Sequence, residues 1–172
     1  MRTGGYAIWL SLDRDTEARL ASVIGDLSAR MNTPVFTPHI TLLSGIRYSV
    51  TTILNALRIL KLEFQNFTVV PEELEAGRTY FHSLYIKIQA GSTVLKLRSR
   101  GENLLNTYRP SPFYPHISLL YGHIDGKQKQ DIINELNSWW QDSELEMNSL
   151  ALMNTTGKPD AWKLIENIPL RD

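Results

Sequence analysis

The chain has 172 residues, of which 42% are hydrophobic and 21% charged, so its composition is that of a globular domain and excludes a disordered chain. Its 18 basic and 18 acidic residues cancel, which disfavours a protein whose main task is to grip a long nucleic acid, because phosphate neutralisation requires a positive excess. The absence of cysteine excludes disulfides, thiolate metal sites and thiol nucleophiles.

The first predicted element is the segment 6–12 (YAIWLSL), whose aromatic and β-branched residues are typical of a buried strand. The segment is too short to cross a membrane, and it runs directly into Asp13, Arg14 and Asp15 without a small-residue cleavage site. We therefore expect a soluble, cytoplasmic protein without a membrane partner.

A helix follows this strand. Its apolar residues recur at helical spacing along one stripe, at Leu20, Val23, Ile24, Leu27 and Met31. Pro34 ends the helix, since the residue before a proline is pushed out of the α region. After the segment 38–43, residues 51–60 show a second helical pattern. Residues 67–76 favour a strand, but Pro71 interrupts it, so we expect this strand at a sheet edge.

The second half of the chain repeats this order of elements. Residues 84–89 alternate as a strand, and residues 94–108 carry an apolar helical stripe in which Gly101 is the weak point. Pro110 lies in the loop that ends this helix and leads into the segment 115–120.

The last third of the chain predicts one helix and two strands. Asp125, with Gln128 three residues later, resembles a capping box that opens a helix reaching Trp140. Residues 144–153 and 161–168 favour two strands on either side of a glycine- and proline-containing turn.

Both halves thus share the order strand, helix, loop and histidine-containing strand, which indicates an internal duplication. Because strands neighbour strands as well as helices, antiparallel sheets in an α+β fold fit better than a doubly wound parallel sheet. We predict one domain spanning residues 1–172, made of two pseudo-symmetric lobes whose histidine-containing strands meet in the middle.

The most informative feature of the sequence is a repeated hexapeptide. Residues 38–43 (PHITLL) recur as residues 115–120 (PHISLL), with one threonine-to-serine change. Successive side chains of a strand point to opposite faces, so each copy presents a histidine and a hydroxyl on one face. These pairs are His39 with Thr41, and His116 with Ser118. Two such strands, facing each other, would line one cleft with two imidazoles and two hydroxyls.

Paired imidazoles and hydroxyls match the chemistry of phosphodiester hydrolysis. The reaction needs a base that takes a proton from water, an acid that protonates the departing oxygen, and donors that stabilise charge on the phosphate. Histidine suits both proton roles because its pKa lies near neutrality. The hydroxyls of Thr41 and Ser118 would donate hydrogen bonds to the phosphate oxygens.

Two alternative roles of the histidines stay open. One is that the duplication kept nothing more than a well-packed strand, although a buried histidine and hydroxyl are unfavourable unless they are paired or used. The second is a zinc site, since with His82 and His123 the chain has four imidazoles, enough in number for one. No His-Glu-x-x-His or cysteine pairing sets a ligand spacing, however, so we expect no metal and no cofactor.

On these residues the chain resembles the two-histidine (2H), or LigT-like, phosphoesterases, and within them most closely the cyclic phosphodiesterases of plants and fungi. The resemblance covers nearly the whole sequence. It is carried by Trp9, by the two histidine motifs within segments 36–41 and 114–121, by the segment 77–81 (GRTYF), and by Trp162.

The resemblance implies a fold of two lobes, each with an antiparallel sheet that faces a central cleft and with helices outside. It also implies a metal-independent enzyme that opens ADP-ribose 1″,2″-cyclic phosphate to ADP-ribose 1″-phosphate and nucleoside 2′,3′-cyclic phosphates to 2′-phosphates. Carried over from the family, His116 would be the base and His39 the acid, beside Thr41 and Ser118. We accordingly expect a monomer whose partner is a small cyclic nucleotide.

Four aromatic residues and one arginine are further candidates for substrate binding. An aromatic face stacks on any nucleobase, which makes candidates of Trp9, Tyr80, Phe81 and Tyr121, with ordinary core packing as the competing interpretation. Tyr80 and Phe81 are adjacent and cannot both face the cleft on a regular strand. Arg78 precedes a strand that would enter the cleft, so it is a candidate phosphate contact.

Three alternative functions remain at this point. An RNA end could be the substrate of the same chemistry, although the zero net charge disfavours it. The basic residues Lys96, Arg98 and Arg100 are expected on a solvated helix face and not in an RNA patch. The chain could also be a nucleotide- or RNA-binding module without turnover, or a metallohydrolase that chelation would inactivate.

Overall fold

The computed structural model describes residues 4–107, 112–136, 140–141 and 143–172. Among these residues no helix has both the length and the apolar character needed to span a bilayer. The helices and strands follow the predicted order. Their bounds are β1 Tyr6–Leu12, α1 Arg14–Met31, β2 Ile40–Ile46, α2 Val50–Glu63, β3 Phe67–Val69, β4 Pro71–Thr79, β5 His82–Ile88, α3 Ser92–Leu105, β6 His116–Leu120, α4 Gly126–Glu135, β7 Leu145–Asn154, a 3₁₀ turn at Pro159–Ala161, and β8 Lys163–Pro169.

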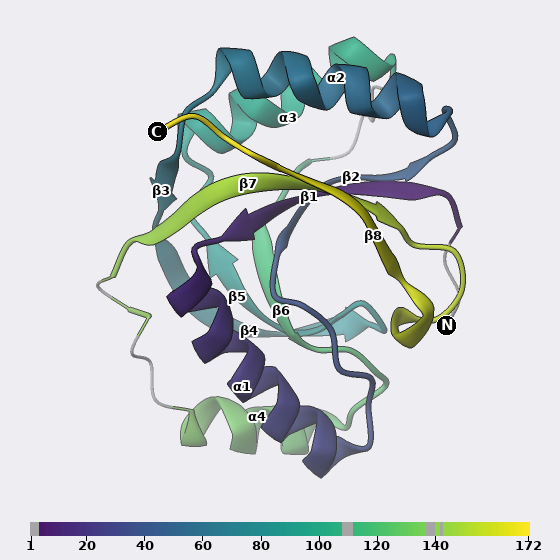
Figure 1. Cartoon of the computed structure of the whole chain (residues 1–172). Coiled ribbons are helices and arrows are strands. Elements are labelled where there is room, and N and C mark those ends of the chain that lie inside the picture. Colours follow the sequence, from purple (N-terminus) through teal and green to yellow (C-terminus); the bar gives the residue numbers. More distant parts are fainter. Residues whose placement is uncertain (1–3, 108–111, 137–139, 142) are drawn as a thin grey trace.

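The strands form one curved antiparallel sheet in the order β3-β7-β1-β2-β6-β5-β4, with β8 paired to β7. Two halves can be distinguished: β1, β2, β3, β7 and β8 form one, and β4, β5 and β6 form the other. In the described part of the chain they are joined by one register pair, Ile40 with Ile117. The sheet curls so that the halves face each other (Figure 1). The predicted α+β fold is therefore confirmed, and the two expected facing antiparallel sheets are the two halves of one sheet, joined through the motif strands β2 and β6.

Two helices cover each half of the sheet (Figure 1). Helices α2 and α3 pack side by side on one side, and α1 and α4 lie on the opposite side. Helix α1 follows β1 in the chain but packs mainly against β6, and α3 follows β5 but packs against β2. Each half of the sheet is thus covered in part by a helix from the other half.

Helix α4 begins where the sequence predicts and ends earlier. The carboxylate of Asp125 caps its N-terminus by accepting a hydrogen bond from the backbone N–H of Lys127 at 2.8 Å. The helix ends at Glu135, so the prediction that it reaches Trp140 is wrong. Trp140 is buried beyond the helix end. At the end of α3, the predicted stripe residue Tyr108 lies outside the described residues.

Gly101 marks close packing of α3 and is more than a weak point in its helix. A Cβ atom there would lie 3.2 Å from the side chain of Leu43, so a larger residue would push α3 away from β2. Arg98 of α3 makes a polar contact with β2, because its guanidinium donates a hydrogen bond to the carbonyl oxygen of Leu42 at 2.8 Å. The guanidinium also lies 4.3 Å above the ring centre of Phe113. The expectation that Arg98 faces solvent is therefore wrong, since this side chain fastens α3 to the first motif strand.

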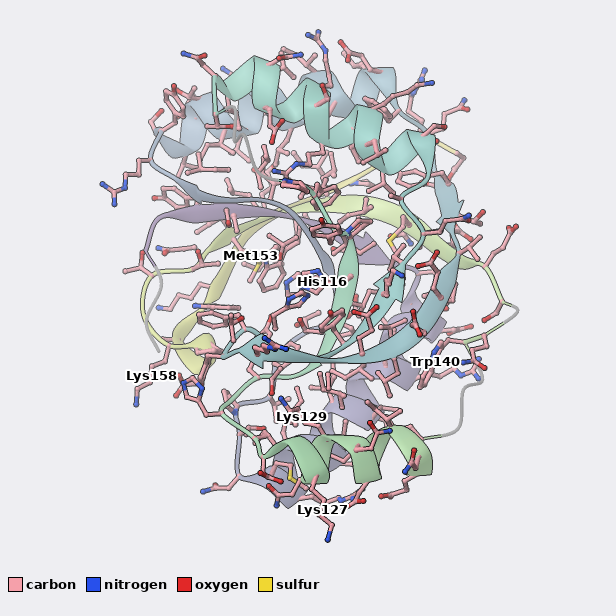
Figure 2. All side chains as sticks on the ribbon, turned by 180° about the vertical axis from the view of Figure 1, so that it is seen from behind. His116, Lys127, Lys129, Trp140, Met153 and Lys158 are labelled. Atoms are coloured by element: carbon pink, nitrogen blue, oxygen red, sulfur yellow. The ribbon has the colours of Figure 1, made fainter. Side chains whose placement is uncertain are left out.

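The predicted strand around Pro71 is divided into two edge strands. Strand β3 ends the sheet on one side and β4, which begins at Pro71, ends it on the other. The pairing of β4 with β5 is irregular between Ala76 and Thr79. At this bulge a Cβ atom on Gly77 would overlap the carbonyl oxygen of His82. Lys129 points from α4 toward the sheet (Figure 2) and donates to the carbonyl oxygen of Gly77 at 2.7 Å.

Two glycine-to-alanine substitutions should have opposite effects on stability. Gly77→Ala is expected to lower the free energy of unfolding by about 1–3 kcal/mol, because the strand must move to admit the methyl group. Gly25→Ala is the matched control. Gly25 lies inside α1 with nothing within 4 Å of its added Cβ, so alanine should raise stability by up to about 1 kcal/mol. Urea denaturation measures both, and a Gly77→Ala protein as stable as the wild type would contradict the bulge contact.

Candidate active site

The pairing of β2 with β6 places both histidine motifs on one wall of a cavity. Ile40 and Ile117 pair with each other, and both are fully buried on the core face. Their neighbours point to the opposite face, and in the antiparallel register His39 lies across from Ser118 and Thr41 across from His116. A cavity of about 430 Å³ opens on this face. Its lining is Gly4, Ala7, Trp9, His39, Thr41, Ser44, Gly45, Phe81, His82, His116, Ser118, Tyr121, Thr155 and Trp162.

The two motif imidazoles are oriented in the same way. Nδ1 of His39 lies 2.6 Å from the carbonyl oxygen of Thr37, and Nδ1 of His116 lies 2.9 Å from that of Tyr114. In both motifs this carbonyl belongs to the residue before the proline. A carbonyl only accepts, so Nδ1 carries the proton in each ring. Nε2 is then the atom that each imidazole offers to a ligand.

Burial keeps both imidazoles neutral in the free protein. The ring of His39 is stacked on Trp9, with centres 3.5 Å apart and planes within 7°. Burial lowers the pKa of His39 to about 3; the Thr37 carbonyl opposes this shift, and the charge of His116 adds to it. Burial also lowers the pKa of His116, against the effect of the Tyr114 carbonyl. At pH 7 each Nε2 is therefore a hydrogen-bond and proton acceptor.

Three hydroxyl groups supply neutral donors near these rings. Thr41 and Ser118 line the cavity, as the motif predicts. In the free protein Ser118 donates to the carbonyl oxygen of Phe81 at 3.3 Å. Burial raises the pKa of the Tyr121 phenol, against the effect of a hydrogen bond with Ser118, so this phenol keeps its proton. The site thus combines proton acceptors with neutral hydrogen-bond donors, a combination that suits acid–base chemistry on a phosphate ester.

Aromatic side chains form the other walls of the cavity. The rings of Phe81 and Trp162 lie 5.7 Å apart at 28°, and the edge of Trp162 meets Trp9 at 5.8 Å. Tyr121 is stacked on Phe36 at 3.7 Å. These faces offer flat apolar surfaces beside the imidazoles, of the kind on which a nucleobase stacks.

The structure brings together most of the predicted site residues. Those that line the cavity are Trp9, His39, Thr41, Phe81, His116, Ser118 and Tyr121. Tyr80 is outside this lining and meets the edge of His123 at 5.6 Å, so only one of the two adjacent aromatic residues faces the cleft. Arg78 is also outside it, in a separate hollow with Lys129. The structure does not bring the Arg78 side chain to the motif histidines.

Sequence reasoning did not place His82 or Trp162 in the cavity wall. Alternation along β5 puts His82 on the same side as the buried Leu84 and Ile86, but in the structure His82 lines the cavity and its ring is stacked on Tyr85. Trp162 comes from the segment before β8, and no local pattern relates it to the motifs. Within the described residues, no group of three or more histidine, aspartate or glutamate side chains is arranged to hold a metal ion.

Similarity to solved structures defines the class of fold. Escherichia coli LigT, solved in complex with 3′-AMP, matches with a TM-score of 0.63 over 99% of both chains at 14% identity. The Thermus thermophilus protein TT0787 matches with a TM-score of 0.61 at 17% identity, over 99% of this chain and 98% of that one. The fold is therefore LigT-like, as the motif resemblance implies.

Similarity in sequence identifies the family. The family model described as "Cyclic phosphodiesterase-like protein" matches residues 4–170. A curated relative, the cyclic phosphodiesterase of Arabidopsis thaliana, is 24% identical over 159 residues, which cover 87% of this chain and 84% of the relative. The chain belongs to the cyclic phosphodiesterase-like family of the 2H phosphoesterases.

The buried imidazole of His39 should make stability depend on pH. Below the ordinary histidine pKa of 6.5 the unfolded chain takes up a proton that the folded state, with a pKa of about 3, refuses. The free energy of unfolding should therefore fall as pH decreases from 6.5 toward 3, by ~1.4 kcal/mol per pH unit from this group. His39→Phe keeps a ring against Trp9 and should remove this part of the slope. Urea denaturation between pH 7 and 5 measures the free energy of unfolding of both proteins. If it depends on pH with the same slope in the wild type and in His39→Phe, the imidazole of His39 is not kept neutral by burial.

Proposed function

We propose that the protein is a metal-independent cyclic phosphodiesterase that hydrolyses small cyclic nucleotides. The expected reactions are the opening of ADP-ribose 1″,2″-cyclic phosphate to the 1″-phosphate and of nucleoside 2′,3′-cyclic phosphates to nucleoside 2′-phosphates. The observation that carries the proposal is the pair His39 and His116 in one cavity, each with Nδ1 held by a backbone carbonyl. This arrangement leaves two Nε2 atoms free for proton transfer on either side of a phosphate group.

In the proposed mechanism His116 is the base. Its neutral Nε2 takes a proton from a water molecule as the water oxygen forms a bond to phosphorus. The hydroxyls of Thr41 and Ser118, with the Tyr121 phenol beside Ser118, donate to the non-bridging oxygens while negative charge develops there. Ser118 exchanges its weak internal bond to the Phe81 carbonyl for this contact.

His39 is the acid in this mechanism. As the bond from phosphorus to the leaving oxygen breaks, the imidazolium gives its proton to that oxygen, and His39 ends neutral. Burial opposes the charged form of His39 in the free protein. An anionic phosphodiester beside Nε2 favours the imidazolium, so the proton that His39 needs would enter together with the substrate.

The cavity supports a substrate of nucleotide size. Its volume of about 430 Å³ lies in the range of small-molecule sites, about 300–1,000 Å³. Phe81 and Trp162 provide faces for a base, and no lysine or arginine is among the described residues that line it. A nucleotide also fits the names of the relatives, since LigT was solved with 3′-AMP and the Arabidopsis relative is a cyclic phosphodiesterase.

The reaction itself is tested with purified protein in EDTA. We expect conversion of nucleoside 2′,3′-cyclic phosphate to the 2′-phosphate only, and of ADP-ribose 1″,2″-cyclic phosphate to the 1″-phosphate. Phosphorus NMR measures both products. Full recovery of both substrates would reject the proposed function. Activity that EDTA abolishes and a divalent metal restores would favour a metallohydrolase instead.

Removing either motif histidine should slow turnover. His39→Ala and His116→Ala are each expected to lower kcat by about 10²–10⁴, the usual effect of a positioned acid or base. His123→Ala is the matched control, because this exposed histidine lies outside the cavity lining and should leave kcat unchanged. A motif variant with a kcat near that of the wild type would remove that histidine from the mechanism.

The direction of proton transfer is tested with a substrate that has sulfur in place of the leaving 3′-oxygen. A thiolate leaves without protonation, so this substrate should restore most of the rate of His39→Ala but little of the rate of His116→Ala. Restoration of His116→Ala alone would reverse the assigned roles of acid and base.

A further inference from the structure

His82 is a third imidazole of the cavity, outside both motifs. Its ring centre lies 4.2 Å from that of His116, with the planes tilted by 51°. Its Nε2 atom is buried and has no hydrogen-bond partner within the described residues. A buried ring nitrogen without a hydrogen-bond partner destabilises the fold, so its presence beside His116 points to a ligand that binds there.

The surrounding residues hold His82 firmly in this place. Its ring is stacked on Tyr85, with centres 3.8 Å apart and planes within 14°. The phenol of Tyr85 in turn donates to a carboxylate oxygen of Glu75 at 2.5 Å. The backbone of His82 lies against Gly77, where the Lys129 ammonium binds the glycine carbonyl. Contacts from β4, β5 and α4 therefore fix an imidazole whose Nε2 has no hydrogen-bond partner among the described residues.

The charge on the ligand changes during the proposed reaction. A cyclic phosphodiester carries one negative charge, whereas the phosphate monoester produced carries close to two at neutral pH, because its second pKa is about 6. The described lining contains no lysine or arginine, so histidines are the cations that this part of the cavity can supply. One imidazolium balances the single negative charge of the substrate. The second negative charge of the product needs another imidazolium.

We propose that His82 is a phosphate-binding residue that takes up a proton when a phosphate monoester dianion occupies the cavity. The inference rests on the proposed function, because that reaction generates the monoester. After hydrolysis His116 holds the proton from water and the product still carries one P–OH group. The proton of this P–OH group passes to Nε2 of His82, so the dianion contacts two imidazolium rings, those of His116 and His82, and no other reactant is required.

The groups around His82 permit this change of charge. Burial and then the charge of His116 lower the pKa of His82 to about 4, and Glu75 acts in the opposite direction. Arg98 lines a shallow hollow together with His82, and its guanidinium is bound to the Leu42 carbonyl. The phenol of Tyr85 stays protonated, since burial and then Glu75 raise its pKa to about 12. His82 is therefore neutral at pH 7 in the free protein and becomes charged only beside an anion.

Calorimetry tests the proposal by counting protons. Adenosine 2′-monophosphate is titrated into the protein near pH 7 in buffers of different ionisation enthalpy. The protein with His82→Gln should take up about one proton fewer than the wild type and bind the monoester about 10- to 100-fold more weakly. The KM for the cyclic substrate should change less. His123→Gln is the matched control and should match the wild type in proton uptake and affinity.

Equal proton uptake by the wild type and His82→Gln would overturn the proposal. A His82→Gln protein that loses as much affinity for the cyclic ester as for the monoester would also overturn it. If His82→Gln does not fold, nitrogen NMR of the wild-type imidazoles replaces it, and a His82 ring that stays neutral with bound monoester is the overturning result. Binding of the monoester requires no turnover. A protein that hydrolyses no cyclic phosphate but protonates His82 would therefore reject the proposed function and keep this inference.

Discussion

The contact between Ile40 and Ile117 is the constraint on which the site depends. Within the described residues, this register pair joins the two antiparallel halves of the sheet. Because both isoleucines are buried on the core face, the neighbouring histidines and hydroxyls must lie on the other face. The hydrophobic effect thus positions the polar groups, since a shift of one residue in either strand would turn an isoleucine into the cavity and a histidine into the hydrophobic core. Stability and active-site geometry come from the same contact.

The chemical character of the cavity follows from how its imidazoles are held. Each motif uses the carbonyl before its proline to fix Nδ1, and burial removes the charge from the ring. The resting cavity is therefore almost neutral, with polar atoms that are oriented but uncharged. In the proposed mechanism a proton enters together with the anion, so charge would be present in the cavity only when a substrate or product is bound. Specificity for phosphate would then depend on geometry and on proton uptake together.

Periodicity in the sequence was sufficient for the elements that follow a simple local rule. The alternation within residues 38–43 and 115–120 placed His39 and His116 on one face, because strand geometry leaves no other choice. The rule failed at His82, the first residue of β5, whose ring lies in the cavity wall and not with the buried Leu84 and Ile86. It also failed at Trp162, which reaches the cavity only through pairing of the last strands. Contacts between distant segments cannot be derived from local periodicity, and these two residues depend on such contacts.

The crossed helices have a consequence for the history of this fold. Helix α1 covers β6 and α3 covers β2, so either half alone would leave part of its sheet exposed to water. If the two halves descend from one shorter gene, its product had to associate as a pair, with each copy lending its helix to the other. Fusion of the two genes would then have turned a symmetric assembly into a single polypeptide. Each half was afterwards free to acquire its own version of the hydroxyl and of the surrounding aromatic residues.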